Sequence, residues 1–327
     1  MATWCAGLAL GLALCSADSE ALSLRVVRTI ELPKSPAGAK VAQLWVPLPN
    51  EAEGQNLVSL PIPKGAQFTR DPATGNRFAY FEFKPAASAP AKLETTFEVL
   101  RTPVAVAPDR PNVHPVPEEA LALWLKPDRL GAPELAKAKA LAAIGPAKST
   151  WDKARAIYGD IFDSMAYDKT APGWGNADVE RACKIGKGNC TDFHGLFLAM
   201  CRSQGIPARM EMGLALKPDK PSETVGAYHC WESFYAPEHG WVPVDISAPR
   251  AAVADPKSAS ADQRYAGFAR LDPWRIGFGR GADSALAPAG SGPVRFGLDP
   301  VLEIDGKRIP LAKESGFTHS WKLEPRK

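Results

Sequence analysis

One short stretch, KGNCTDFHGLFLAMCRSQG (residues 187–205), limits the fold most, because a glycine-containing turn becomes an amphipathic helix there. Apolar side chains recur at helical spacing until a candidate C-terminal cap at Gly205: Phe193, Leu196, Phe197, Met200 and Cys201. Three runs typical of strands follow, IPARMEMGLAL, AYHCWESFYAP and GWVPVDISAP. The last two are predicted to form a hairpin around APEHG. The sequence therefore predicts an α+β unit in which one helix packs on an antiparallel sheet.

Cys190 lies at the first turn of this predicted helix. Backbone N–H groups without intrahelical partners and the positive end of the helix dipole both favour a thiolate at such a position. A thiolate nucleophile needs a histidine to exchange its proton and often a third group that orients the imidazole. Cys190 is therefore the candidate nucleophile.

His229 and Asp245 are the candidate partners, one on each strand of the predicted hairpin. If Tyr235 pairs with Gly240 or Trp241, Asp245 becomes a diagonal neighbour of His229. Such neighbours lie about 7–8 Å apart at Cα, within reach of an imidazole–carboxylate hydrogen bond. The register that puts both side chains on one face is not fixed by the sequence.

The N-terminal third contains alternating runs rich in β-branched and aromatic residues: LSLRVVRTIEL, KVAQLWVPLP, RFAYFEFKP and KLETTFEVLRT. Turns such as DPATGN separate them, so an all-β sandwich is predicted over residues 22–106. A proline-rich connector and two helices are expected over 107–148, and the α+β core over 149–250. Ser149 or Thr150 is expected to cap the first core helix. A loop-rich extension with short strands is expected over 251–327.

Residues 1–21 read as a signal peptide, with an apolar run from Trp4 to Cys15 and small residues after it. No basic residue precedes the run. We expect a secreted or periplasmic protein with no integral membrane span in the mature chain. In an oxidising compartment, the four cysteines beyond the leader predict disulfides, although a free nucleophile would leave at least one other thiol unpaired.

GNCTDFHGLFLAMCRSQGIPARMEMG, followed by YHCWESFY and GWVPVDIS, resembles the transglutaminase-like (transglutaminase core) superfamily, of the secreted bacterial type. The resemblance implies a papain-like core whose Cys–His–Asp triad would be Cys190, His229 and Asp245. The chain departs from the family at Ser233, where an acid is usual. Glu232 stands one place earlier, on the opposite face of a strand.

On this reading Cys190 attacks a peptide or protein amide and forms a thioester, with His229 as the proton carrier and Asp245 holding the ring. The N–H of Cys190 and a second donor, with Trp174 as one candidate, would stabilise the oxyanion. No cofactor or metal is expected. Hydrolysis and transfer to an amine stay open, as does the oligomeric state.

Two other classes of function stay open. A non-catalytic binding module of the cell envelope would leave Cys190 oxidised with Cys183 or Cys201. A zinc site could be built from Cys183, Cys190, His194 and Cys230, but no CxxC pair is present. His194 and Asp192 are instead interpreted as packing and hydrogen-bonding residues near the helix start. The net charge of +3, without a basic stripe, argues against nucleic acid as a partner.

Overall fold

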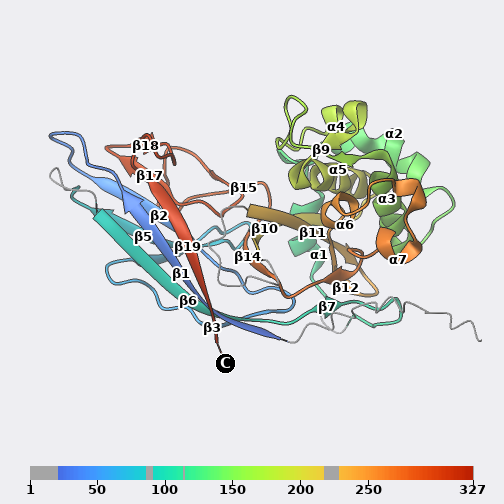
Figure 1. Cartoon of the computed structure of the whole chain (residues 1–327), viewed down its shortest axis with the longest axis horizontal. Helices are drawn as coiled ribbons and strands as arrows, with labels where there is room; N and C mark the ends of the chain where they lie inside the picture. The colour runs from blue at the N-terminus through green and yellow to red at the C-terminus, as the bar shows by residue number, and fades with distance from the viewer. Residues whose placement is uncertain (1–20, 86–90, 113–114, 217–227, 327) are drawn as a thin grey trace, which may run out of the picture.

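The computed structural model describes residues 21–85, 91–112, 115–216 and 228–326. The leader predicted over 1–21 lies outside these residues except for Ala21, so its cleavage and the compartment stay predictions. Among the described residues, no helix has the length and apolar character needed to cross a bilayer. Figure 1 shows strands gathered at one end of the molecule and most helices at the other.

The all-β end consists of two facing antiparallel sheets. The first has the order β19 (Thr318–Pro325), β1 (Leu22–Leu32), β6 (Ala91–Arg101), β3 (Gln55–Ser59). The second has the order β18 (Lys307–Ile309), β17 (Val301–Ile304), β2 (Ala42–Leu48), β5 (Arg77–Phe83), β4 (Gln67–Arg70). The four strand runs read from the N-terminal sequence are β1, β2, β5 and β6, which confirms the predicted sandwich.

Three strands from the end of the chain complete these sheets. β19 pairs with β1, and β17 pairs with β2 while forming a hairpin with β18. In Figure 1 the red C-terminal strands accordingly lie among the blue N-terminal ones. Strands β17, β18 and β19 of the C-terminal extension therefore belong to the sandwich, in which they pair with strands from the start of the chain.

The other end of the molecule is an antiparallel sheet with the order β12 (Gly240–Val244), β11 (Tyr228–Ala236), β10 (Ala208–Ala215), β14 (Arg275–Arg280). Helix α5 (Cys190–Ser203) packs on β10 and β11, and α2 (Pro133–Ile144), α3 (Thr150–Ser164) and α4 (Val179–Ile185) pack on α5. The helix-on-sheet arrangement predicted from residues 187–249 is confirmed. Strand β14 was not predicted, and it comes from the C-terminal extension.

The remaining described elements are short. They are β7 (Val104–Ala105) with β13 (Arg270–Leu271), β15 (Asp283–Ser284) with β16 (Val294–Arg295), β8 (Ala166–Tyr167) with β9 (Lys187–Gly188), α1 (Glu118–Ala122), η1 (Leu123–Leu125), α6 (Ser247–Ala251), η2 (Pro256–Ser258) and α7 (Ala261–Arg264).

The helix ends follow local chemistry. Ser149 caps α3 as expected, since its hydroxyl accepts a hydrogen bond from the N–H of Asp152 at 3.0 Å. Helix α5 ends at Ser203 with Gln204 as its C-cap, and Gly205 follows with φ of +71°. That left-handed conformation suits glycine, so the chain can turn from α5 into β10 at this point.

The sandwich and the helix-covered sheet share one hydrophobic core. Leu24 and Val26 of β1 and Leu323 of β19 belong to the same buried cluster as Phe193 of α5 and Met212 of β10. The sandwich is thus a structural support of the core.

We expect Leu323→Ala to destabilise the whole protein by about 2–5 kcal/mol, the usual cost of truncating a buried leucine. Leu323 is 1% exposed and lies opposite Val26. Denaturant unfolding measures the change. The matched control is Lys322→Ala, at the exposed residue next to Leu323. Its free energy of unfolding should stay within about 0.5 kcal/mol of that of the parent protein. Equal stability of both variants would mean that the C-terminal strand does not belong to the shared core.

Candidate active site

The start of α5 is fixed by a reciprocal cap around Cys190. Asn189 is the N-cap: its side-chain oxygen accepts from the N–H of Thr191 at 3.0 Å. The Asp192 carboxylate accepts from the N–H of Asn189 at 3.0 Å. Among the described residues, no hydrogen bond from the N–H of Cys190 is present. That N–H is therefore available to a developing oxyanion beside its own sulfur.

Asp192 also holds the preceding loop against the helix. Its carboxylate accepts from the N–H of Gly175 at 2.7 Å and from the N–H of Ala177 at 3.2 Å. Gly188 must be a glycine here, since a Cβ on it would lie 2.4 Å from the Cβ of Asp192. The interpretation of Asp192 as a hydrogen-bonding residue near the helix start is confirmed by these contacts.

The hairpin brings His229 and Asp245 together. Tyr235 pairs with Trp241, one of the two predicted registers, and the β11–β12 ladder ends at the Glu232–Val244 pair. Asp245 follows β12, where its N–H donates to the carbonyl of Gly267 at 2.8 Å. The Nε2 atom of His229 lies 2.7 Å from Oδ2 of Asp245. The contact that the hairpin register permitted is therefore present.

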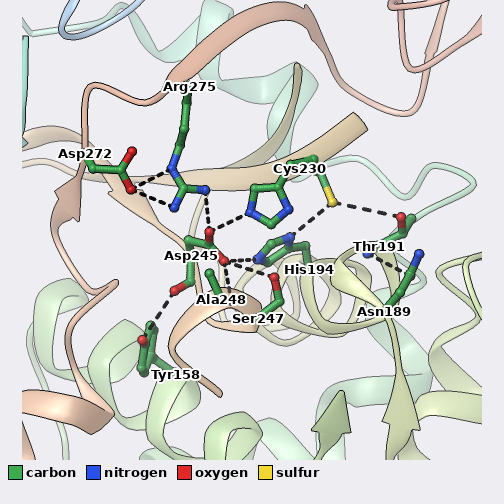
Figure 2. Close-up of polar contacts among 11 residues, drawn as sticks. Tyr158, Asn189, Thr191, His194, Cys230, Asp245, Ser247, Ala248, Asp272 and Arg275 are labelled. Carbon is green, nitrogen blue, oxygen red and sulfur yellow. Dashed lines mark hydrogen bonds and ion pairs between the residues drawn. The ribbon is translucent and has the colours of Figure 1, made fainter. Parts of the chain in front are cut away.

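Asp245 is a buried carboxylate surrounded by donors (Figure 2). Besides His229, Oδ2 accepts from Nη1 of Arg275 at 2.5 Å. Oδ1 accepts from the Ser247 hydroxyl at 3.0 Å and from the N–H of Ala248 at 3.1 Å. Burial alone would raise the pKa of Asp245, but the charges of His229 and Arg275 and hydrogen bonds from His194 and His229 hold it well below its usual value. The ionised form of Asp245 is therefore favoured.

The anion determines the protonation of the histidine. Burial favours neutral His229, but the charge and hydrogen bond of Asp245 outweigh it, and together with a hydrogen bond to Cys190 they raise the pKa of His229 to about 9. Because Nε2 faces Asp245, Nδ1 is the ring nitrogen left for Cys190.

The pKa of Cys190 shifts in the opposite direction, below its usual value. A hydrogen bond from Cys230 is the main cause; burial opposes it, and the hydrogen bond and charge of His229 add to it, so the pKa of Cys190 lies well below its usual value. These opposite shifts favour a thiolate at Cys190 and an imidazolium at His229.

The four described cysteines are all free thiols, so of the two alternatives that the sequence left open, disulfides or unpaired thiols, the second is present. Cys183 is exposed on α4, Cys201 is buried in α5 and Cys230 is buried on β11. The oxidised pairings of Cys190 with Cys183 or Cys201 are absent. Within the described residues no three His, Cys, Asp or Glu side chains are grouped to hold a metal, so the zinc alternative lacks geometric support.

Sequence reasoning missed Arg275 and the environment of Cys230. Arg275 begins β14, and its guanidinium also contacts the Asp272 carboxylate at 3.0 Å. The segment RIGFGR alternates apolar and small residues, a weak strand signal that does not reveal its partner β10. Cys230 contacts His194, which the sequence indicated only as a packing and hydrogen-bonding residue.

Glu232 and Ser233 lie on opposite faces of β11, as the alternation predicted. Glu232 is fully buried and, among the described residues, its carboxylate oxygens have no hydrogen-bond partner. Burial raises its pKa well above the usual value, which favours the neutral acid. Trp174, the candidate second oxyanion donor, is 39% exposed, and that role stays a prediction.

A cavity of about 510 Å³ lies next to Asp245, between residues 103–105, which follow the sandwich strand β6, and residues 245–275 of the core. Its lining includes Val104, Asp245, Arg270, Asp272 and Arg275. Cys190 and His229 are not among its lining residues. The cavity therefore adjoins the Asp245 carboxylate and does not reach the Cys190 sulfur.

Residues 137–246 match the transglutaminase-like superfamily (Transglut_core), a segment that contains all three predicted site residues. An uncharacterised protein of Haemophilus influenzae is 29% identical over 206 residues, covering 54% of this chain and 55% of that protein. The chain thus spans about half the length of this relative.

A solved structure shows the same fold. A protein of Cytophaga hutchinsonii described as a candidate cysteine protease superposes with a TM-score of 0.55 at 16% identity, covering 94% of this chain and 99% of that one. The periplasmic domain of TgpA from Pseudomonas aeruginosa has a TM-score of 0.38 at 18% identity, covering 69% of this chain and 89% of that one.

We expect Arg275→Met to cost about 3–5 kcal/mol at pH 7, because it removes one of the two cations that contact a buried carboxylate. Asp245 has a depressed pKa, so its ion pair stabilises the fold above the unfolded pKa of about 3.9 and stops doing so as pH falls through the folded pKa. The deficit should therefore be full at pH 7 and should shrink below about pH 4. Denaturant unfolding at several pH values measures it.

Arg270→Met is the matched control, because Arg270 is an exposed cation of the neighbouring strand β13. It should change stability by less than about 0.5 kcal/mol. A deficit of Arg275→Met that does not vary with pH would contradict the assignment of Arg275 as the counter-ion of Asp245.

Proposed function

Residues 137–246 of this chain form a transglutaminase-like core, and on that premise we propose that the protein is a cysteine-dependent amide hydrolase or acyltransferase that works through a thioester on Cys190. The observation that carries the proposal is the 2.7 Å contact between Nε2 of His229 and the buried carboxylate of Asp245, together with a pKa of Cys190 that a hydrogen bond from Cys230 and the hydrogen bond and charge of His229 lower. A protonated imidazole beside a thiolate is the resting state that a thiol nucleophile requires.

In the first half-reaction the Cys190 thiolate attacks the carbonyl carbon of a peptide amide. The carbonyl oxygen becomes an oxyanion next to the N–H of Cys190, which has no acceptor among the described residues. His229 then gives the proton on Nδ1 to the departing amine nitrogen. The C–N bond breaks, and the products of this step are a neutral amine, a neutral imidazole and a thioester.

In the second half-reaction neutral His229 removes a proton from the incoming nucleophile, which attacks the thioester. Water yields a carboxylic acid, and a primary amine yields a new amide. Either route expels the Cys190 thiolate and restores the imidazolium. Throughout, Asp245 keeps Nε2 of His229 protonated, so Nδ1 is always the nitrogen that faces the sulfur.

Hydrolysis is the outcome that we favour, since water needs no dedicated amine-binding site. The substrate class is a peptide or protein amide. We place this activity outside the cytoplasm, in the secreted or periplasmic space, because residues 1–21 have the features of a signal peptide.

Alkylation by iodoacetamide tests the nucleophile. Cys190 should react with an apparent pKa well below the usual value, because its thiolate is stabilised in the folded protein. The rate should stay level above that pKa and change again near pH 9, where His229 loses its proton. The labelled peptides are quantified by mass spectrometry across the pH range.

Cys183 is the internal control in the same sample. It is exposed to reagents, and the partial burial of its thiol raises its pKa. It should react only in the alkaline range. Cys190→Ala should abolish trapping of an activated acyl probe, while Cys183→Ala should retain it. A Cys190 that reacts no faster than Cys183 at pH 6 would remove the basis for an enzyme and favour a non-catalytic binding module.

The choice between hydrolysis and transfer is tested with one peptide amide, with and without an added primary amine. We expect the free acid as the main product in both samples, since water resolves the thioester. Mass spectrometry distinguishes the acid from the amine adduct. An adduct that dominates at millimolar amine would instead assign the protein as a transferase.

A further inference from the structure

The cavity beside Asp245 takes no part in the proposed mechanism. Its volume of about 510 Å³ falls in the range of pockets that hold small molecules, roughly 300–1,000 Å³. Its lining comes from β7, from β13, from the start of β14 and from α6. Apart from two arginines and two aspartates, the lining residues are small or apolar. The cavity therefore combines an apolar wall with a few charged groups, as ligand sites usually do.

Arg275 is a lining residue whose donors are only partly used. Its Nε and Nη2 donate to Oδ2 of Asp272 at 3.2 and 3.0 Å, and its Nη1 donates to Oδ2 of Asp245 at 2.5 Å. Figure 2 shows the guanidinium between these two carboxylates. A guanidinium has five N–H donors, so two of them have no acceptor within the described residues. Arg275 is thus a cavity-lining cation that retains two donors.

Arg270 is the second cation of the lining, and its side chain is exposed. Across the part of the chain that the structure describes, its guanidinium makes no ion pair and no hydrogen bond. Arg270 of β13 lies directly opposite Ala105 of β7, and both residues line the cavity. Side chains of directly opposed residues share one face of a sheet, so the small side chain of Ala105 leaves space beside Arg270.

The charges of the lining are not balanced. Asp245 contacts His229 and Arg275, and Asp272 contacts Arg275. With the ring of His229 protonated, these four side chains sum to zero. Arg270 then leaves one positive charge in excess. A cleft with an excess of one charge attracts ligands of the opposite charge, so an anion is the ligand that this lining favours.

We propose that this cavity binds the C-terminal carboxylate of a short peptide with small apolar side chains. The carboxylate pairs with Arg270 and accepts from the remaining N–H groups of Arg275, since a guanidinium matches the planar geometry of a carboxylate. The small side chains lie against β7 and Leu271. That the ligand is a peptide rests on the function proposed above, because hydrolysis of a peptide amide yields such a carboxylate. The recognition of an anion does not depend on that function.

The test is calorimetric titration of the full chain with two probes, N-acetyl-Ala-Ala and its C-terminal amide. The acid should bind at least about tenfold more tightly, because only the acid carries the charge that pairs with Arg270. The titration is repeated after alkylation of Cys190 with iodoacetamide. The affinity for the acid should not change, since Cys190 is not among the residues that line the cavity.

Two variants locate the ligand. Arg270→Met should weaken binding of the acid about tenfold, the cost of one charged contact, and leave binding of the amide unchanged. Ala105→Leu should weaken binding of both probes, because the larger side chain occupies the space beside Arg270. Both residues are exposed, so both variants should fold, which thermal unfolding verifies. Arg295→Met is the matched control, because Arg295 is an exposed arginine of the equally short strand β16 and does not line the cavity.

Absence of binding, equal affinity for acid and amide, or full affinity for the acid in Arg270→Met would each overturn this inference. The proposed function would stay intact, because none of these measurements involves the Cys190 thiolate. Loss of binding after alkylation of Cys190 would also overturn it, since the ligand would then lie at the nucleophile. A Cys190 that titrates in the ordinary range would remove the proposed function alone, and binding of the acid that depends on Arg270 would still establish the anion site.

Discussion

The buried negative charge of Asp245 is the interaction on which the rest of the site depends. A carboxylate that is 1% exposed can stay ionised only with cations and donors on all sides, and here His229, Arg275, Ser247 and a backbone N–H supply them. These partners come from three different elements: β11, β14 and the start of α6. The ionised form of Asp245 therefore depends on contacts from distant parts of the fold. Its charge in turn favours the protonated ring of His229.

The start of α5 makes a second, independent contribution. Asn189 and Asp192 cap each other's backbone, so Cys190 lies at the positive end of the helix dipole with an N–H that has no acceptor within the part of the chain that the structure describes. Asp192 also holds the loop before the helix at Gly175 and Ala177. The position of the Cys190 sulfur is thus fixed by hydrogen bonds between residues close in sequence. The position of the His229 ring is fixed by contacts between distant segments. The sheet that joins them is supported by a sandwich built from both ends of the chain.

Local patterns predicted much of this arrangement. Alternation of apolar and polar residues predicted strands β1, β2, β5 and β6, and helical spacing predicted α3 and α5. The predicted hairpin register placed Asp245 within reach of His229. Contacts between distant segments were not predictable in this way. Arg275 lies 30 residues after Asp245 in a glycine-rich strand whose neighbour β10 is much earlier in the chain. The contact of His194 with Cys230 depends on how closely α5 packs on β11, which no spacing in the sequence encodes.

The protonation of His229 is the most direct measure of the central claim. Selective 15N labelling of the five histidines, with His229→Asn for assignment, reports whether both ring nitrogens carry protons. The account predicts an imidazolium at pH 7 that loses its proton only near pH 9, and an earlier loss when Cys190 is replaced by alanine. A neutral His229 ring at pH 7, titrating near the ordinary value of about 6.5, would contradict it.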